Sequence, residues 1–352
     1  MSSATPSPIG SVIADRYEVL DSLGSGQHGE VWRVHDRNLN AEYALKLLEA
    51  NQIGGPWAEA HLLNSLSGDF ILPIRNADTT PEGTRYLVTD VAAHGTVMDR
   101  IDATIGVPEE QAVSWVREAC NGLARVHRHG LLHRDVKPEN LFLTESGKCL
   151  VGDLSLAGAQ NASGCVHAGG TLETMAPEVG AIALPGYGGG HEVYSVRSEV
   201  FSLGATLYWM LTGTPPVSGT SYADAASATP VDVWELAPHV TRGTRDITMK
   251  ALCRDPAERF PDPAALAAAL GSRNKGDRRW NRMATHPGHE RCYDGAKAGR
   301  AVRLCVILRN GSSGYVFEVR HSSSDRRHAE DGKSVTAAGL NQAIRSTIRA
   351  IG

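Results

Sequence analysis

The chain has 352 residues, of which 41% are hydrophobic and 21% charged, so a folded protein with a sizeable core is expected. It holds no apolar run of 18 residues and no basic region followed by an apolar stretch near its start, so we expect neither a membrane-spanning helix nor a secretory signal. Six scattered cysteines form no C-x-x-C pair, which favours reduced thiols and a cytoplasmic location.

The net charge of −4 conceals a strong asymmetry along the chain. Residues 1–272 hold 19 Lys/Arg and 32 Asp/Glu, a balance of −13, whereas residues 273–352 hold 16 and 7, a balance of +9. This difference indicates two parts with different electrostatic tasks.

The first part begins with small and polar residues, and we expect residues 1–15 to be a disordered tail. A strand-rich stretch follows, in which apolar and polar residues alternate. The predicted strands are Tyr17–Leu20, Glu30–His35, Tyr43–Leu48 and Arg85–Thr89, with a helix over Trp57–Leu66.

Helices dominate from Pro108 onward, where Pro and two Glu residues suit a helix start. The almost wholly apolar segment Phe201–Leu211 predicts a helix buried on all sides. The glycine-rich segment 183–195 is interpreted as an insertion, and 272–279 as a linker. Beyond the linker, strands near Val302–Leu308 and Gly314–Arg320 and a helix near Val335–Ile351 predict a small α+β domain over 280–352.

A G-x-G-x-x-G-x-V pattern lies at Leu23–Val31, between two predicted strands. Glycines allow backbone amides to approach phosphate groups closely. A dinucleotide-binding fingerprint would need a helix directly after the glycines, but here a strand follows, so the pattern favours a phosphate-covering hairpin.

The strand Tyr43–Leu48 carries Lys46, a candidate point charge for a nucleotide phosphate. Alone it is better explained as a surface lysine at a strand end. Glu59, on the next predicted helix, is the candidate partner that would fix Lys46 in an ion pair.

Residues 133–140 read HRDVKPEN, and this segment resembles the catalytic loop of eukaryotic-like (Hanks-type) bacterial serine/threonine protein kinases. The resemblance implies an α+β, bilobal kinase fold over 16–271, with a small β-rich N-lobe over 16–92 and a larger helical C-lobe over 93–271. It also implies the cofactors ATP and Mg²⁺ (or Mn²⁺), with protein serines and threonines as substrates.

The resemblance implies a role for each residue of the catalytic machinery. Asp135 would accept the proton of the substrate hydroxyl, and Lys137 would neutralise charge on the γ-phosphate. Asn140 and Asp153 would hold the metal, because amide and carboxylate oxygens suit Mg²⁺.

The same resemblance implies the remaining site residues. The expected ATP-binding residues are Leu23, Gly24, Ser25, Gly26, Gly29, Val31, Ala44, Lys46, Thr89, Asp90, Ala92 and Phe142. Candidate phosphosites on the activation segment are Ser163, Thr171 and Thr174, with Arg134 as the partner of the phosphate. Glu178 and Arg259 would form a buried ion pair that braces the C-lobe.

Two positions depart from the family pattern. The metal-binding triplet is Asp153-Leu154-Ser155, with Ser in the place of Gly, and Glu199 stands where an Asp is expected to brace the catalytic loop. The alternative function is therefore a pseudokinase, a nucleotide-binding scaffold whose basic C-terminal domain docks a partner or nucleic acid.

The basic domain over 280–352 resembles no family. Its charge permits docking of a regulatory partner, docking onto its own acidic kinase domain, or binding of nucleic acid, and a purely structural role is also open. His286, His289 and Cys292 form an H-x₂-H-x₂-C pattern, with His321 and His328 further on, so a zinc site is conceivable. The intervening Pro287-Gly288 turn and the absence of paired cysteines argue against such a site.

Overall fold

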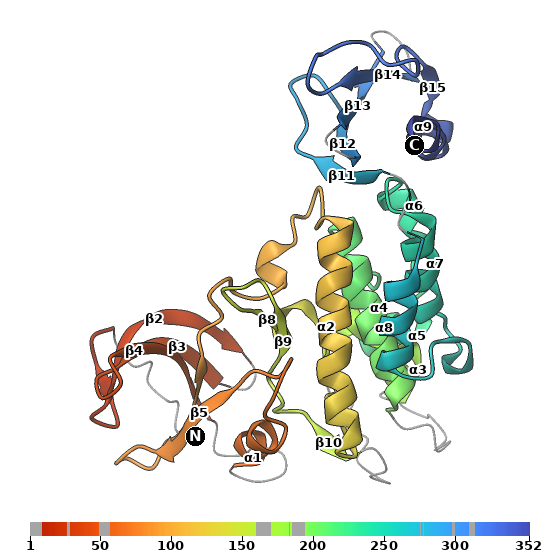
Figure 1. Ribbon diagram of the computed structural model, residues 1–352. Helices are drawn as coiled ribbons and strands as arrows, with labels where there is room; N and C mark the ends of the chain where they lie inside the picture. The colour runs from red at the N-terminus through yellow and green to blue at the C-terminus, as the bar shows by residue number, and fades with distance from the viewer. Residues whose placement is uncertain are drawn as a thin grey trace. The chain divides into compact units, whose positions relative to one another are not determined.

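The computed structural model describes residues 9–26, 29–48, 57–159, 170–182, 184, 194–274, 276, 278–297, 300–309 and 314–352 (Figure 1). The chain divides into two compact units, which are described separately. The first unit comprises residues 1–99 and 121–170, and the second comprises 100–120 and 171–352. Of the helices in the described residues, none has both the length and the apolar character needed to cross a membrane.

The first unit contains a six-stranded sheet in the order β1-β2-β3-β4-β6-β5, with antiparallel neighbours. Its strands are β1 (Val12–Ile13), β2 (Tyr17–Gly26), β3 (Gly29–Asp36), β4 (Ala41–Leu47), β5 (Ile74–Thr79) and β6 (Arg85–Asp90). Alternate side chains such as Trp32 and Val34 point into one core, as the period of two requires. Helix α1 (Ala58–Ser65) follows β4 in the chain, and the predicted strand-rich stretch is confirmed.

The prediction of a disordered tail over 1–15 is wrong for Val12 and Ile13. They form β1, which pairs with β2 through Ile13 and Tyr17. The side chain of Ile13 is 7% exposed and joins the core of the sheet. Burial of this one apolar residue stabilises the strand, although the polar residues around it led to the prediction of disorder.

The rest of the first unit is built from short elements that surround the HRDVKPEN segment. These are the C-terminal part of α2 (Glu109–Arg128), then β7 (Leu131–Leu132), the 3₁₀ turn η2 (Pro138–Asn140), β8 (Leu141–Leu143), β9 (Cys149–Val151) and β10 (Gly158–Ala159). Strands β8 and β9 form a hairpin, and β10 pairs with β7.

The second unit contains a set of helices and a C-terminal sheet. The helices are α3 (Pro177–Ile182), α4 (Val196–Thr212), α5 (Tyr222–Ser227), α6 (Val233–Leu236), α7 (Arg242–Ala251) and α8 (Pro263–Ser272), with short 3₁₀ turns at Leu172–Thr174 and Pro256–Glu258; a further 3₁₀ turn, Met98–Arg100, lies at the boundary between the units. Ser195 caps the N-terminus of α4, because its hydroxyl accepts a hydrogen bond from the amide of Ser198. Gly213, with a φ of +80°, caps the C-terminus. Most of its residues are buried, as its apolar sequence predicts.

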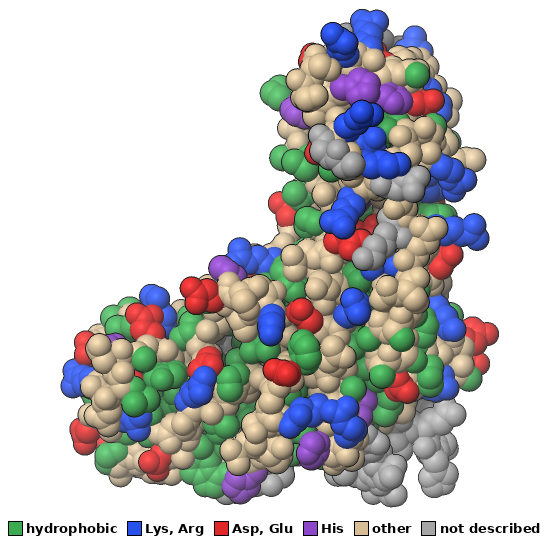
Figure 2. All heavy atoms as spheres, in the orientation of Figure 1, with side chains coloured by type: hydrophobic (Ala, Val, Ile, Leu, Met, Phe, Trp, Pro, Cys, Tyr) green, Lys and Arg blue, Asp and Glu red, His purple; other side chains and the backbone are tan. Residues whose placement is uncertain are grey.

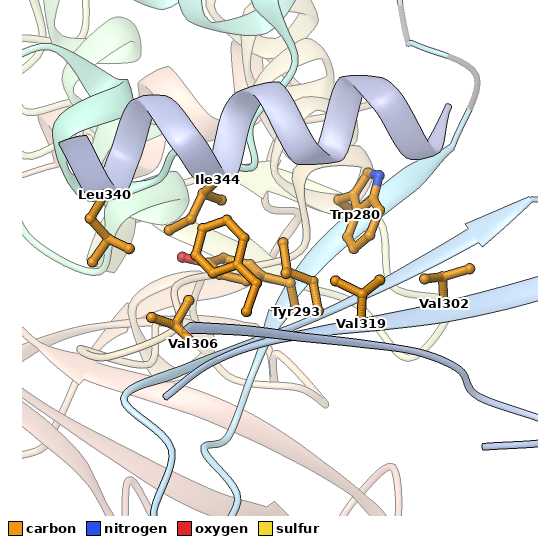
Figure 3. Packing of buried hydrophobic residues seen from close by; sticks show 9 residues of the cluster. Trp280, Tyr293, Val302, Val306, Val319, Leu340 and Ile344 are labelled. Carbon is orange, nitrogen blue, oxygen red and sulfur yellow. The ribbon is translucent and has the colours of Figure 1, made fainter. Parts of the chain in front are cut away.

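The C-terminal subdomain (residues 279–351) has a five-stranded antiparallel sheet in chain order. It consists of β11 (Arg279–Met283), β12 (Arg291–Lys297), β13 (Arg300–Leu308), β14 (Gly314–His321), β15 (Ser334–Thr336), the turn η5 (Ala337–Gly339) and α9 (Leu340–Ile351). Helix α9 lies along one face of the sheet, and Leu340 and Ile344 contact the strands through a shared core (Figure 3). The two strands predicted from sequence are confirmed, whereas β11, β12 and β15 were missed.

The interpretation of 272–279 as a linker is wrong for Arg273 and Arg278, which are held by the folded chain. The side chain of Arg273 is 2% exposed and donates hydrogen bonds to Glu110 at 2.6 Å and to Thr244 Oγ1 at 2.9 Å. Arg278 donates to backbone carbonyls that include those of Gly295 and Gly352. The buried Arg273 and the partly exposed Arg278 thus fix both of their positions to the folded chain through several hydrogen bonds.

Candidate active site

The glycine-rich segment forms the hairpin of β2 and β3, in which Gly26 pairs with Gly29. Gly24 has a φ of +154°, a conformation that side-chain-bearing residues rarely adopt, and no other atom lies within 4 Å of the place where a Cβ would be. Leu23 is 48% exposed. The side chain of Ser25 lies outside the described residues. At Gly24 the backbone is therefore open to the approach of phosphate groups.

Lys46 lies on β4, opposite Val31 on the second strand of this hairpin. Its side chain is 13% exposed, and Nζ contacts Oδ1 of Asp153 at 3.0 Å. Two residues 107 positions apart are thus brought together within the first unit. The predicted partner Glu59 belongs to α1, but its side chain lies outside the described residues, so that ion pair stays a prediction.

Asp135 lies at the centre of the HRDVKPEN segment, with only 6% of its side chain exposed. Lys137 Nζ contacts Oδ2 of Asp135 at 3.0 Å. Asn140 Nδ2 donates to the backbone carbonyl of Asp135 at 2.7 Å and to its Oδ2 at 3.0 Å. Because these two bonds use the amide nitrogen, Oδ1 of Asn140 is the atom left to serve as a metal ligand.

His133 is a positioning residue that the sequence analysis did not assign. Its Nδ1 accepts a hydrogen bond from the amide of Asp135 at 3.3 Å, so the ring proton lies on Nε2, which donates to the carbonyl of Gly152 at 2.9 Å. The buried imidazole thus joins the Asp135 loop to the residue preceding Asp153. The sequence signal for this role was the position of His133 directly before Arg134 and Asp135.

Asp153 has a φ of +54°, in the left-handed region that non-glycine residues rarely occupy. Its Oδ1 accepts a hydrogen bond from Ser155 Oγ at 2.7 Å in addition to the contact with Lys46. Arg134, beside Asp135, also has a positive φ, of +70°. Unfavourable backbone conformations of this kind gather at functional sites, where the surrounding structure maintains them.

The residues expected around adenine are brought together in part by the strands of the first unit. Ala44 and Thr89 are direct partners across β4 and β6, and Thr89 is 9% exposed. Phe142 lies on β8 over Gly152, where a Cβ would come within 2.7 Å of the phenyl ring. Asp90 directs its carboxylate to Arg75, with bonds of 2.6 and 2.7 Å, and its expected contact with adenine stays a prediction. Ala92 follows directly after β6.

In the second unit, Glu178 and Arg259 form a bidentate ion pair with two distances of 2.7 Å. The Arg259 side chain has no exposed surface, and Ser198 donates a further hydrogen bond to Glu178 at 2.8 Å. Glu199 is fully buried on α4. Thr171 precedes the 3₁₀ turn Leu172–Thr174 and Thr174 ends it, whereas Ser163 lies outside the described residues.

A family profile described as "Protein kinase domain" matches residues 17–269. The chain belongs to the protein kinase family. Among curated proteins, this kinase chain is 29% identical over 275 residues to serine/threonine-protein kinase PknB of Mycobacterium leprae, a match that covers 73% of the chain and 43% of the relative. It is 27% identical over 265 residues to a probable serine/threonine-protein kinase of Clostridium perfringens, covering 72% of the chain and 37% of that protein. The kinase chain therefore spans less than half the length of these two relatives.

Proposed function

We propose that the chain is an enzyme that transfers the γ-phosphate of ATP to serine and threonine hydroxyls of proteins, including its own. The observation that carries this proposal is the set of contacts around Asp135 and Asp153. One carboxylate is held by Lys137 and Asn140, and the other by Lys46 and Ser155. These are the charged and polar groups that phosphoryl transfer needs, since its catalysis depends on positioning and charge neutralisation.

In the proposed reaction the hydroxyl oxygen of the substrate forms a bond to the γ-phosphorus while the bond from that phosphorus to the β-γ bridging oxygen breaks. Asp135 orients the hydroxyl and accepts its proton, and ADP leaves. Lys46 and Lys137 balance negative charge on the phosphates. Asn140 and Asp153 offer oxygen ligands that fit Mg²⁺ or Mn²⁺, which would neutralise phosphate charge when bound.

Incorporation of labelled phosphate from ATP tests this proposal. Wild-type protein is expected to label itself and a generic basic protein on serine and threonine. Lys46→Met and Asp135→Asn should lower labelling by at least about a hundredfold. Lys148→Met and Asp69→Asn are matched controls, which replace an exposed lysine and an exposed aspartate, and both variants should retain the labelling. Labelling that stays the same in the Asp135→Asn variant would contradict the assigned base.

The pseudokinase alternative predicts a different result in the same experiment. Nucleotide would bind, as measured by calorimetry, but no phosphate would be transferred above the level of the Asp135→Asn variant. The Ser155 and Glu199 departures favour this alternative, whereas the presence of all the residues that perform the chemistry favours transfer.

We further propose that the C-terminal subdomain docks onto helix α6 of its own chain. Asn341 Nδ2 donates to the carbonyl of Glu235 at 2.8 Å, and the Arg345 guanidinium lies 5.0 Å from the ring centre of Trp234. Arg245 approaches the same indole at 5.1 Å. Lys and Arg side chains are prominent on this subdomain (Figure 2), and its positive balance suits the acidic remainder of the chain.

Replacement of Trp234 by Ala tests this docking. Amide exchange in α9 is expected to accelerate, whereas Tyr222→Ala, an aromatic truncation at a partly exposed site, should leave it unchanged. Salt-dependent binding of the full chain to nucleic acid would favour the other role of the basic surface. A cytoplasmic location is proposed as well, because ATP is the substrate and the described cysteines are free.

A further inference from the structure

The C-terminal subdomain brings together two histidines and two cysteines that have no part in phosphoryl transfer. The ligand atoms of His286, His289, Cys292 and Cys305 all lie within 4.8 Å of one another. The first three form the H-x₂-H-x₂-C pattern, and Cys305 comes from the next strand. Among the described residues, no other set of three or more His, Cys, Asp or Glu side chains converges in this way.

Sheet register explains why the two cysteines meet. Cys292 on β12 lies directly opposite Cys305 on β13. The adjacent pair, Tyr293 and Leu304, belongs to the core beneath α9 (Figure 3). Because side chains alternate along a strand, both thiols point to the sheet face opposite α9. Both cysteines are nevertheless fully buried.

The loop between β11 and β12 explains how the histidines reach the same face. The amide of His289 donates to the carbonyl of His286 at 3.0 Å across a tight turn with Pro287 and Gly288 at its centre. Gly288 has a φ of +79°, the value that the third position of a type II turn requires, and Pro suits the second. In the sequence analysis the Pro287-Gly288 turn argued against a metal site. In the structure the same turn places both imidazoles near the thiols.

Three of the distances between ligand atoms lie near those of a tetrahedral zinc site. Nδ1 of His286 lies 3.0 Å from Sγ of Cys292 and 3.5 Å from Sγ of Cys305, and Nδ1 of His289 lies 3.6 Å from Sγ of Cys292. Bonds of about 2.3 Å to sulfur and about 2.0 Å to nitrogen separate such ligands by about 3.5 Å around Zn²⁺. Both histidines present the same ring nitrogen, so no ring has to turn over.

We propose that His286, His289, Cys292 and Cys305 form a closed Cys₂His₂ site for a structural zinc ion, which fastens the loop over 284–290 to the sheet. Two thiolates and two neutral imidazoles balance the charge of Zn²⁺, and four protein ligands leave no position for a substrate. Thiolate and imidazole are ligands that select zinc over Mg²⁺ and Ca²⁺. The site is independent of the proposed kinase function.

His321 and His328 lie outside this cluster, although the sequence placed them among the conceivable ligands. Their rings face each other with centroids 5.4 Å apart. They therefore serve as a matched control, as a histidine pair in the same subdomain.

The test is metal analysis of the full chain, purified without a histidine tag or chelator. One zinc per chain is expected by mass spectrometry. Exchange into Co²⁺ should give the thiolate-to-cobalt charge-transfer band and the intense visible bands of a tetrahedral site. Modification of thiols with an organomercurial should release the zinc, as measured with a colour indicator. Absence of stoichiometric zinc and of these cobalt bands, or a Cys292–Cys305 disulfide in protein purified anaerobically, would overturn the proposal.

Variants identify the ligands. Cys292→Ser and Cys305→Ser should lose the zinc, whereas His321→Ala/His328→Ala and Cys253→Ser should retain it. Because a ligand variant could fail to fold, His286→Cys serves as a second test. It should keep one zinc and strengthen the thiolate-to-cobalt band, since three thiolates replace two. Zinc retained in Cys292→Ser, or lost only with His321 and His328, would refute the assignment.

Discussion

Ser155 Oγ donates a hydrogen bond of 2.7 Å to Oδ1 of Asp153, the carboxylate oxygen that Lys46 Nζ contacts at 3.0 Å. Protein kinases commonly have glycine at this position of the triplet. The serine thus replaces backbone freedom with a hydroxyl that orients the carboxylate. Asp153 also holds a strained φ of +54°, so its position depends on such contacts.

If Asp153 holds the metal as proposed, Ser155→Ala should raise the Mg²⁺ concentration needed for half-maximal kinase activity by about tenfold, because loss of a hydrogen bond that orients a metal ligand typically weakens metal binding by that factor or more. Ser155→Thr keeps the hydroxyl and should stay close to wild type. The measurement is the initial rate of phosphate transfer as Mg²⁺ is varied at saturating ATP. An unchanged Mg²⁺ requirement in the alanine variant would contradict a role of Ser155 in positioning Asp153.

The ion pair of Glu178 and Arg259 gives a prediction about stability in the second unit. Replacing Arg259 by Met leaves the mostly buried Glu178 carboxylate without its bidentate partner, and we expect a loss of about 3–5 kcal/mol in the free energy of unfolding. Arg259→Lys should recover only part of this loss, since an ammonium lacks the planar fork. Amide exchange in helix α4, which is packed against this pair, provides the measurement.

Arg242 provides the matched control for this prediction. It pairs with Asp246 at 3.3 Å, one turn along α7, and its side chain is 79% exposed. Arg242→Met is expected to change the free energy of unfolding by no more than about 0.5 kcal/mol. Equal losses in the Arg242 and Arg259 variants would mean that burial does not determine the contribution of the Glu178 pair.

The activation segment gives a prediction about phosphorylation. Thr174 is 2% exposed, whereas Thr171 is partly exposed. A hydroxyl that is almost fully buried can receive phosphate only after local opening, so phosphopeptides from protein incubated with ATP should carry Thr171 or Ser163 rather than Thr174. Mass spectrometry of wild type and of Thr174→Val decides the matter. Phosphate found predominantly on Thr174 would show that the segment opens readily.

The parts of the site that were predicted from sequence are those whose chemistry lies in a short segment. Lys137 and Asn140 are within five residues of Asp135, and all three contact one another in the structure. The spacing of residues within HRDVKPEN therefore determines most of the contacts around Asp135. The contact of Lys46 with Asp153 spans 107 residues and was not predicted, because the sequence offered Glu59 as the partner of Lys46.

The parts that the sequence did not reveal depend on partners distant in the chain. Cys305 becomes a ligand only through the register of β12 and β13, because nothing around it in the sequence marks it as one. Arg273 lies in a polar segment with linker composition, and its buried place depends on partners distant in the chain, among them Glu110 and Thr244. Strand β15 has three residues, too few for a periodic pattern to appear.

The ion pair of Asp36 and Arg16 gives a prediction about pH. Arg16 donates two hydrogen bonds, of 2.9 and 2.7 Å, to the Asp36 carboxylate, which is 1% exposed. Hydrogen bonding from Arg16, and to a smaller extent from the amides of Asn38 and Leu39, holds the pKa of Asp36 below its ordinary value of 3.8, although burial opposes this shift. Because the pKa is lower in the folded state, the stabilisation is fully present above about pH 4 and is lost as the pH falls through the lowered value.

We therefore expect Asp36→Asn to destabilise the first unit by about 1.5–3 kcal/mol at pH 7, since hydrogen bonds to a charged group are lost, and to abolish this contribution to acid sensitivity below pH 4. Glu42→Gln removes the charge from an exposed partner of Arg33 and should change stability by less than about 0.5 kcal/mol. The measurement is thermal unfolding of both variants and wild type between pH 7 and pH 3. If Asp36→Asn loses stability on acidification as steeply as wild type, then the acid sensitivity of the first unit arises from other carboxylates.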